Sequence, residues 1–378
     1  MRRLLYLTAD PGVPVLGHKG ASVHVRELCT AFAQAGVEVH IASPRIASEG
    51  DQLPVPATLH GIAPVAPKDH VPRTLRDAVQ AQARTVTALC ARLGIGAIFE
   101  RFSLFSAAGV RAAAELGLRH LLEVNAPLRD EAARFRTLPH RELAASLETE
   151  VMAGTDRVLA VSEPLARTLA ADGVDRARIE VLPNGVAAER FAPSRRDPGR
   201  FVVGFAGSMK PWHGIETLVE AVSRVPAVHL EVAGHGPQDP LFERLPAERV
   251  TRFGVLPHTR VMELMAAWDV GVAPYAPVDG FWFSPLKVLE YMAAGACPVA
   301  SDLGDAAEVL GHGRRGVLVP PGDAEALAEA LARLAADRER AWLLGNRARA
   351  WVAAHRSWSA NASRALTLID TRRIPEAA

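Results

Sequence analysis

Three of the chain's four lysines, Lys19, Lys210 and Lys287, lie where a positive charge could meet a phosphate. Lys19 and Lys210 fall in the glycine-rich segments 8–24 and 205–214, and Lys287 falls near the start of an expected helix. The other 39 of the 43 basic residues are arginine, so lysine is the exception here. A compact ammonium suits a phosphate oxygen as a point charge. The spacing favours a phosphate-bearing ligand, with chance placement on exposed loops as the alternative.

Both glycine-rich segments follow an apolar strand and precede an amphipathic helix. In that position glycines let backbone N–H groups approach an anion at a helix N-terminus. Neither segment carries G-x-G-x-x-G or G-x-x-x-x-G-K-[ST], so a dinucleotide site for NAD or a P-loop is not supported. One such loop is equally well explained by the tight turns of an α/β sheet. Two of them, opening two similar halves, favour a bound ligand.

A further anion site is expected where a helix begins in the sequence SPLKVLEYMAAG. Ser284 could cap this helix with Pro285 at its first position, so that the N–H groups of Leu286 and Lys287 face an anion. Glu290 follows one turn later among apolar neighbours. Its carboxylate could accept hydrogen bonds from sugar hydroxyls, or it could be an ordinary surface or capping glutamate.

These residues must be positioned by strands and helices, and the hydrophobic pattern predicts two series of such elements. Short apolar runs alternate with helical patterns, as in parallel sheets covered by helices. Strands are predicted near residues 4–8, 37–42, 97–99, 120–124, 157–161 and 179–182, and then near 201–205, 229–233, 250–253, 270–273, 298–301 and 317–319. Predicted helices include 23–34, 73–93, 163–171, 215–225, 286–294, 324–335 and 358–369. Residues 183–200, rich in Pro, Gly and charge, are the predicted linker.

Length and composition exclude several classes of protein. A chain of 378 residues is expected to form two domains, and 43 basic against 42 acidic residues leave no electrostatic footprint for nucleic acid. The three scattered cysteines, Cys29, Cys90 and Cys297, indicate reduced thiols in a cytoplasmic protein and lack metal-ligand spacing. No apolar run is long enough to span a bilayer, and the first is too short for a signal peptide.

The chain resembles the retaining nucleotide-sugar glycosyltransferases of family 4, in a branch with KPWHG and SPLK motifs. The matching pieces are GHKGASVHVRELCTAFAQAG (17–36), ERFSLFSAAG (100–109), LLEVNAPL (121–128), DRVLAVSE (156–163), VLPNGV (181–186), FAGSMKPWHG (205–214), VAGHGP (232–237), FSPLKVLEYMAAGACPVAS (283–301) and GVLVPPGD (316–323). The resemblance implies an α/β GT-B fold, in which two Rossmann-like doubly wound parallel-sheet domains face a central cleft. It implies an acceptor domain at 1–190, a nucleotide-sugar donor domain at 191–355, and a last helix within 356–378 that crosses back to the first domain.

The resemblance also assigns roles. Glu290 matches the second glutamate of the family's E-x7-E element, which binds the ribose of the donor, and Val255 and Leu256 lie where the base is held. Residues 17–20 match the loop that closes on the diphosphate and the acceptor. The implied donor-binding set is Gly17, Lys19, Gly20, Gly207, Ser208, Lys210, His213, Val255, Leu256, Asp279, Trp282, Ser284, Pro285, Leu286, Lys287 and Glu290.

The chain departs from the family pattern at three places. The first glutamate of E-x7-E falls at Trp282, so its contact with the donor sugar is missing or comes from Asp279 or the backbone near 281–284. The arginine and lysine of the phosphate loop are Ser208 and His213, and Lys210 could supply the missing charge. A histidine often found beside the sugar is replaced by Asn125.

The expected reaction moves a hexosyl group to an acceptor hydroxyl with retention of configuration. Lys210, Lys287 and loop N–H groups would stabilise the diphosphate leaving group. The sequence holds no D-x-D motif, so no metal and no cofactor besides the nucleotide-diphosphate sugar is expected, and no protein nucleophile is assigned. Asn125, Arg101 and Glu100 are candidates for lining the reacting centre, with a structural ion pair as the alternative for Arg101. His18, His24 and His213 could each act as a base or phosphate ligand or simply pack.

The acceptor is left open among small natural products, lipid-linked sugars and polysaccharides. Segment 129–147 combines basic and apolar residues that could bind an anionic acceptor or rest on anionic lipid at the inner membrane face. The alternative is a solvated helical face whose charges are balanced. The residues concerned are Arg129, Arg134, Arg136, Arg141, Phe135 and Leu138, with Asp130, Glu131 and Glu142 as the nearby acids.

Three other functions compete with glycosyl transfer. A nucleotide-sugar epimerase of the same fold would need more acid–base groups than the sparse acids of 279–290 provide. A non-catalytic sugar-binding protein of the periplasmic type disagrees with the absence of a secretion signal and with the lysine-bearing loops. An NAD-dependent dehydrogenase lacks its glycine fingerprint. The sequence contains no feature that indicates an oligomeric state.

Overall fold

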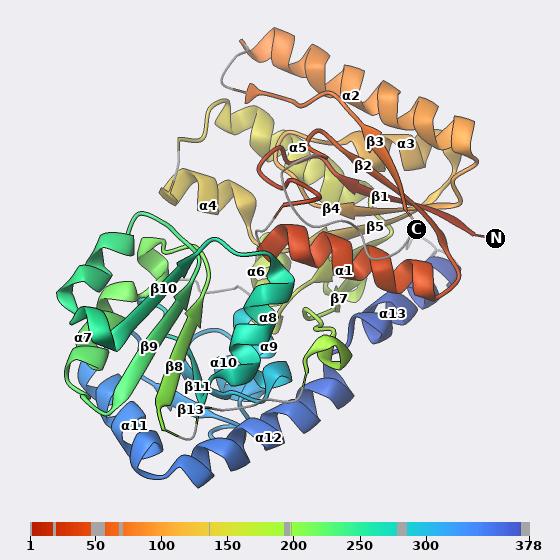
Figure 1. Cartoon of the computed structure of the whole chain (residues 1–378). Helices are drawn as coiled ribbons and strands as arrows, with labels where there is room; N and C mark the ends of the chain where they lie inside the picture. Colours follow the sequence, from red (N-terminus) through yellow and green to blue (C-terminus); the bar gives the residue numbers. More distant parts are fainter. Residues whose placement is uncertain are drawn as a thin grey trace. The chain divides into compact units, whose positions relative to one another are not determined.

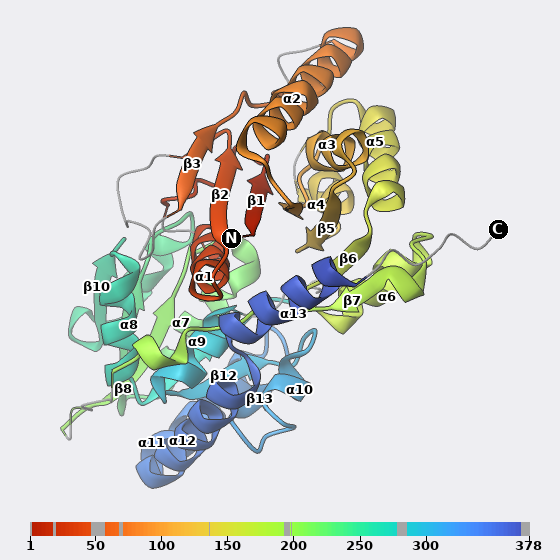
Figure 2. The same cartoon turned by 90° about the vertical axis from the view of Figure 1, so that its right-hand side faces the viewer.

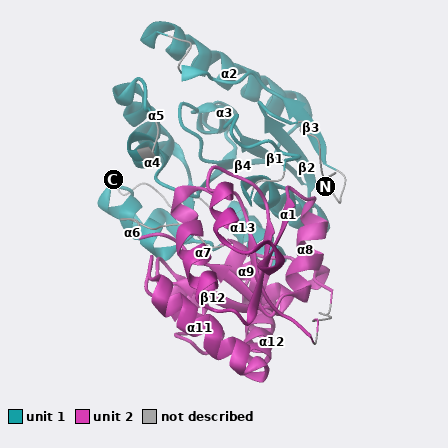
Figure 3. Ribbon diagram, turned by 60° about the vertical axis from the view of Figure 1, so that its left-hand side comes forward, with its two compact units in different colours: residues 1–183, 358–378 teal, residues 184–357 magenta. Residues whose placement is uncertain are grey.

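The computed structural model describes residues 2–17, 20–46, 57–67, 71–135, 137–192, 197, 199–277 and 286–371, with the side chain of residue 135 left out. The chain divides into two compact units (Figure 3). Unit 1 combines residues 1–183 with 358–378, and unit 2 holds residues 184–357.

Unit 1 is built on a parallel sheet of seven strands in the order β3-β2-β1-β4-β5-β6-β7 (Figure 1). Its strands are β1 (Arg3–Thr8), β2 (Glu38–Ser43), β3 (Thr58–Gly61), β4 (Ala97–Arg101), β5 (Arg119–Val124), β6 (Arg157–Ala160) and β7 (Ile179–Val181). Its helices are α1 (Gly20–Gln34), α2 (Pro72–Leu93), α3 (Ala108–Leu116), α4 (Leu128–Phe135), α5 (Arg141–Gly154), α6 (Glu163–Ala171) and α13 (Trp358–Asp370), with a 3-10 turn η2 (Arg176–Arg178). The six strands predicted for this half are confirmed, and β3 is an additional, half-exposed edge strand.

Unit 2 has a parallel sheet of six strands in the order β10-β9-β8-β11-β12-β13. Its strands are β8 (Phe201–Ala206), β9 (Val228–Ala233), β10 (Val250–Gly254), β11 (Val270–Ala273), β12 (Cys297–Ser301) and β13 (Val317–Val319). Its helices are α7 (Ile215–Ser223), α8 (His258–Ala267), α9 (Leu286–Ala294), α10 (Ala306–Val309), α11 (Ala324–Ala336) and α12 (Arg338–His355), with 3-10 turns η3 (Ala188–Arg190), η4 (Pro211–His213), η5 (Asp239–Arg244) and η6 (Ala247–Arg249). All six predicted strands are confirmed.

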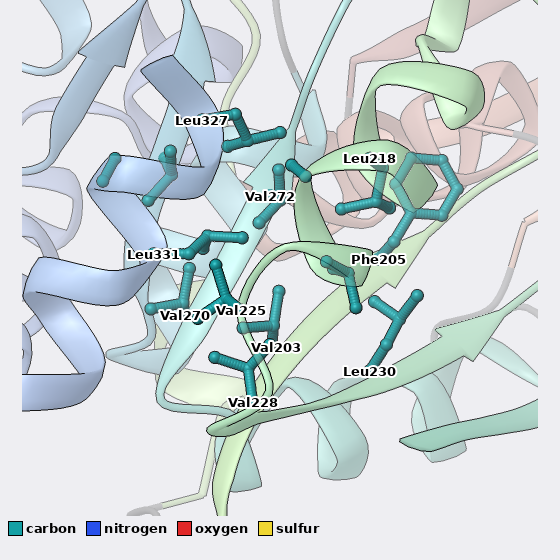
Figure 4. Packing of buried hydrophobic residues seen from close by; sticks show 14 of the residues in the cluster. Val203, Phe205, Leu218, Val225, Val228, Leu230, Val270, Val272, Leu327 and Leu331 are labelled. Carbon is teal, nitrogen blue, oxygen red and sulfur yellow. The ribbon is translucent and has the colours of Figure 1, made fainter. Parts of the chain in front are cut away.

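The central strands are apolar on both faces because helices cover both sides of each sheet. In unit 2, Val203 and Phe205 of β8 pack with Val272 of β11, Leu218 of α7 and Leu327 of α11, and all five are fully buried (Figure 4). Burying each such side chain contributes about 1.5–3 kcal/mol. This core holds the carboxyl ends of β8 and β11 in place, and the loops that carry the candidate site begin there.

The last helix, α13, lies against α1 of unit 1 although the chain enters it from unit 2 (Figure 2). Trp358 at its start is 5% exposed. Farther along, the Asn361 Nδ2 atom donates to the carbonyl oxygen of Pro183 at 2.7 Å, and an Arg364–Glu180 ion pair ties the helix to β7. The predicted helix at 358–369 is confirmed, and it completes one face of the unit 1 sheet.

The passage between the units is shorter than the predicted linker at 183–200. Unit 2 begins at Asn184, and Val186 and Phe191 are already buried in its core. The Val186 N–H donates to the carbonyl oxygen of Arg356 at 2.8 Å, which joins the two connecting stretches on the unit 2 side. Residues 186–191 are therefore packed against unit 2, although the sequence there resembles a linker.

Candidate active site

The ammonium group of Lys287 is buried in unit 2 with no hydrogen-bond partner among the described residues. It lies 4.3 Å from the ring centroid of Phe205 and 5.4 Å from that of Tyr275. Burial lowers the pKa of Lys287 to about 7, although Glu290 opposes the shift. An ammonium buried without a hydrogen-bond partner is energetically costly, and an anion beside it would reduce that cost.

The loop that follows β8 passes directly over this ammonium. A Cβ atom built on Gly207, where φ is +146°, would lie 3.0 Å from the Lys287 Nζ atom. At the far end of the loop, Gly214 has φ +65°, and a Cβ there would lie 1.6 Å from the carbonyl oxygen of Pro274. Glycine suits both ends because φ is positive at each, and at Gly214 the backbone of Pro274 also leaves no room for a side chain. Predicted residues Gly207 and Lys287 are thus brought together.

His213 lies in the same loop and packs near the rings of Phe205 and Tyr275. Burial and the charge of Lys287 lower the pKa of His213 to about 3, which makes the imidazole neutral. Its Nδ1 atom hydrogen-bonds to the carbonyl oxygen of Ser208, so Nδ1 carries the proton and Nε2 has none to donate. In this tautomer His213 fixes the shape of the loop and cannot donate a hydrogen bond to a phosphate from Nε2.

Glu290, on α9, forms a hydrogen-bonded pair with His258 at the start of α8. The Nε2 atom of His258 lies 2.6 Å from Oε1 of Glu290, and the two side chains are 15% and 17% exposed. His258 therefore holds one carboxylate oxygen and leaves Oε2 for another partner. Val255, three residues before it, is 63% exposed, which is unusual for a large apolar side chain. Sequence reasoning did not mark His258, because it lies 32 residues from Glu290.

Unit 1 holds a second polar cluster at the carboxyl ends of β4 and β5. Parallel pairing places Arg101 beside Glu123, and Asn125 follows β5. The Nδ2 atom of Asn125 donates to Oε2 of Glu123 at 3.1 Å, and Arg101 forms an ion pair with the same carboxylate. Two predicted reacting-centre residues, Arg101 and Asn125, are therefore brought together by a glutamate that sequence reasoning missed. Its signal was a carboxylate inside the apolar strand HLLEV.

Glu100 has a different environment from Arg101. Its carboxylate is 1% exposed and lies 2.9 Å from Nε2 of His120, on the face of the sheet covered by α3. A Cβ on Gly109 of that helix would lie 2.2 Å from a Glu100 oxygen. Neighbouring residues of a strand point to opposite faces, so the side chain of Glu100 points away from that of Arg101. Glu100 is an interior hydrogen-bonding partner of His120 here.

The first glycine-rich loop is held by Arg26 of α1. Its Nη1 atom donates to the carbonyl oxygens of Gly17 at 2.6 Å and Val15 at 3.1 Å. Gly20 is the first residue of α1. The remaining predicted residues of this site, namely His18, Lys19, Asp279, Trp282, Ser284 and Pro285, lie outside the described residues.

The basic segment 129–147 forms α4 and α5. Arg129 lies 3.3 Å from Glu148 and 3.9 Å from Asp130, so acids balance this arginine. Arg136 and the side chain of Phe135 lie outside the described residues. Across the described helices, none combines the length and apolarity needed to cross a bilayer. Within the same residues, no three His, Cys, Asp or Glu side chains gather as metal ligands would.

Comparisons with known proteins agree with this architecture. Residues 18–190 match the family model described as Glycosyltransferase Family 4, and residues 200–337 match the one described as Glycosyl transferases group 1. Among solved structures, a sucrose-phosphate synthase from Thermosynechococcus elongatus superposes with a TM-score of 0.75 at 23% identity, covering 97% of this chain and 98% of that one. An Anabaena protein, Alr3699/HepE, solved in complex with UDP-glucose, gives 0.75 at 17% identity and covers 97% and 100%. The fold is that of a GT-B glycosyltransferase.

The chain belongs to the family 4 glycosyltransferases, as its motifs implied. A D-inositol 3-phosphate glycosyltransferase from Pseudarthrobacter chlorophenolicus is 28% identical over 349 residues, which cover 83% of this chain and 81% of that enzyme. The chain spans about half the length of two other curated relatives, 52% and 53%, at 31% and 32% identity.

Proposed function

We propose that this protein transfers a hexosyl group from a nucleotide-diphosphate sugar to an acceptor hydroxyl, with retention of anomeric configuration and without a metal ion. The observation that carries the proposal is the buried ammonium of Lys287, which lies close under the Gly207 loop and has no hydrogen-bond partner among the described residues. Family membership supports sugar transfer as the reaction class.

The donor nucleotide would bind along the carboxyl ends of the unit 2 strands. Lys287, Lys210 and the N–H groups of the Gly207 loop would receive the diphosphate. The Oε2 atom of Glu290 would accept from the ribose hydroxyls, while Oε1 stays on His258. The exposed apolar face of Val255, with Leu256 beside it, would cover the base.

Departure of the nucleoside diphosphate is the step that these charges would assist. Negative charge grows on the leaving phosphate as the glycosidic bond breaks, and preorganised cations stabilise that charge most in a water-poor site. The acceptor hydroxyl would then attack from the face that the phosphate leaves, so no protein nucleophile is required. The resemblance to retaining enzymes supports this route, and Arg101 and Asn125 would line the reacting centre.

Several kinds of acceptor fit the proposed reaction. Small natural products, lipid-linked sugars and polysaccharides all offer the required hydroxyl, and the arginines of 129–147 would bind an anionic one. The protein would act in the cytoplasm, with peripheral contact at the inner membrane face if the acceptor is lipid-linked. An epimerase or a non-catalytic sugar-binding protein is not favoured by the comparisons.

Thermal-shift screening against UDP-, GDP-, ADP- and dTDP-sugars tests the donor assignment. A ligand at 100 times its Kd stabilises by about 2.7 kcal/mol, so one nucleotide should raise the Tm by roughly 5 °C or more. Lys287→Met should remove that shift. The matched control is Arg333→Met, which deletes an exposed cation of α11 that pairs with Glu329 and should keep the shift. If no nucleotide sugar raises the Tm, the proposed donor site is wrong.

Product analysis tests the remaining features. NMR of the glycoside formed should give the same anomeric configuration as the donor, and EDTA should leave the rate unchanged. An inverted product would overturn the retaining mechanism, and a strict requirement for Mg²⁺ would overturn the metal-free one.

A further inference from the structure

Unit 1 contains a buried carboxylate that no sequence motif marked. Glu123, near the end of β5, is 3% exposed. One of its oxygens, Oε2, lies 3.1 Å from the Nδ2 atom of Asn125 and 3.5 Å from the Nη1 atom of Arg101. The other, Oε1, lies 2.7 Å from Nε2 of His24 in α1. A single carboxylate therefore joins residues from β4, from the end of β5 and from α1.

This carboxylate is held in its charged form. Burial on its own would raise the pKa of Glu123, but His24, Arg101 and the hydrogen bond from Asn125 outweigh that effect and lower the pKa. A buried carboxylate that stays ionised is a strong acceptor for each of these donors. Losing the charge would weaken all three contacts at once.

His24 is itself fixed by the last helix. Its ring meets the indole of Trp358 edge to face, with 4.8 Å between centroids, and both side chains are buried. The Nδ1 atom of His24 is buried without a hydrogen-bond partner among the described residues, so Nε2 makes its hydrogen bond. Trp358 of α13 therefore contacts His24, His24 contacts Glu123, and Glu123 contacts both Arg101 and Asn125.

The same sheet provides an internal comparison. His120 and Glu100 form a second buried His–Glu pair, at 2.9 Å, on the opposite face of β4 and β5. His120 also bonds to Thr155 through Nδ1, at 2.9 Å, and the pair touches neither Arg101 nor Asn125 in any described contact. It has the chemistry of the His24–Glu123 pair without the connection to the reacting-centre candidates.

We propose that Glu123 is a positioning residue for glycosyl transfer, which fixes the side chains of Arg101 and Asn125 while His24 and Trp358 fix Glu123. The inference rests on the proposed function, because Arg101 and Asn125 matter only if they line the reacting centre. Glu123 touches no substrate in this role and acts through its two neighbours.

Replacing Glu123 by Gln tests the role with little change of shape. The amide loses the negative charge, and its single oxygen cannot accept both from His24 and from Arg101 and Asn125, so these side chains are held less firmly. A misplacement of about 1 Å near the chemistry costs up to roughly 100-fold in rate. We therefore expect kcat to fall by about 10- to 100-fold. The donor KM should change by less than about twofold, because unit 2 binds the donor.

The assay measures release of nucleoside diphosphate from the sugar nucleotide that the thermal-shift screen selects, as hydrolysis without an added acceptor. The matched control is His120→Gln, which breaks the equivalent pair on the opposite face. E123Q and H120Q should both lower the Tm, but only E123Q should lower kcat per folded molecule. Equal kcat values for the two variants would overturn the proposal. His24→Gln removes the other support of Glu123 and carries the same expectation if E123Q does not fold.

A double-mutant cycle separates positioning from general damage. Since Glu123 acts through Asn125, adding E123Q to Asn125→Ala should lower kcat much less than E123Q lowers it alone. Fully additive effects would contradict the inference. Nucleotide binding and turnover by the wild-type protein test the proposed function separately, because neither depends on these variants.

Discussion

The side chain of Lys287 is buried, so its charge state should depend on whether an anion binds beside it. Near neutral pH the free protein holds Lys287 in both charge states, since burial lowers its pKa to about 7. A diphosphate placed beside it would favour the ammonium and raise the pKa again. Proton uptake and nucleotide binding should therefore be coupled.

The coupling predicts a falling nucleotide affinity with rising pH. Above about pH 7 the free protein loses the Lys287 proton while the complex keeps it, so the Kd should rise by up to about tenfold per pH unit until the complex also titrates. Calorimetry at pH 8 in two buffers of different ionisation enthalpy should report uptake of a fraction of a proton. Lys287→Met should abolish that uptake, and a wild-type Kd that does not change between pH 7 and 9 would refute the coupling.

A second prediction concerns His258, which holds one oxygen of Glu290. Without it the carboxylate can rotate, and a hydrogen bond to a charged group is lost. His258→Ala should raise the Kd for the nucleotide by about tenfold and leave kcat nearly unchanged at saturating donor. The control is His229→Ala, which removes a histidine of β9 that bonds to Thr251. The same Kd in H258A and wild type would show that Glu290 needs no such support.

The sequence identified the charged residues Lys287 and Glu290 but not the side chains His258 and Glu123, and the reason is physical. Lys287 stands out because lysine is rare in this chain, and Glu290 because its charge conflicts with apolar neighbours in the sequence. His258 and Glu123 have hydrogen-bond partners 32 and 99 residues away, and spacing along the chain does not encode such contacts. Glu100 and Arg101 are neighbours in the sequence, but alternation along β4 sends the two side chains to opposite faces.

Among the elements, the buried strands were the easiest to predict. Continuous apolar runs bounded by turn residues identify β1, β8 and β12, because both faces of these strands are covered. β3 escaped prediction since its residues are half exposed and form no apolar run. α12 was also missed, and its exposed Trp342 and Leu343 blur the amphipathic pattern that would mark a helix.

The loop between β8 and α7 supports a prediction about backbone geometry. Gly214→Ala should strain a left-handed residue by about 1 kcal/mol and also push the loop from the Pro274 carbonyl, for a further 1–3 kcal/mol or so. Gly117→Ala is the matched control, because its φ of +66° is nearly the same while no atom lies within 4 Å of the added Cβ. Urea unfolding should separate the two, and only G214A should weaken nucleotide binding. Equal losses of stability would argue against the close approach.

For the whole molecule, the division into units predicts what truncation would do. Deleting 358–378 removes α13 from unit 1, exposes the surface that Leu368 and Ile369 cover, and takes Trp358 from His24. Unit 1 should lose stability, whereas unit 2 keeps Lys287, Glu290 and the Gly207 loop. Differential scanning calorimetry should show one transition moving down by several degrees, and the nucleotide should still stabilise the other. Loss of nucleotide binding in the truncated chain would contradict this separation.

The fold class was predictable as a whole because strand and helix patterns repeat in two series. The family resemblance predicted that the last helix returns to the first domain, because a helical pattern alone does not show which sheet a helix covers.

Unit 2 is inserted, in chain order, within unit 1, because residues 184–357 lie between the two parts of the first unit. On the ribosome, every residue of the second unit is therefore made before α13 emerges to complete the first. The unit that starts first is finished last, and until then the face of α1 that α13 covers, with His24 on it, stays open to water and to chaperones.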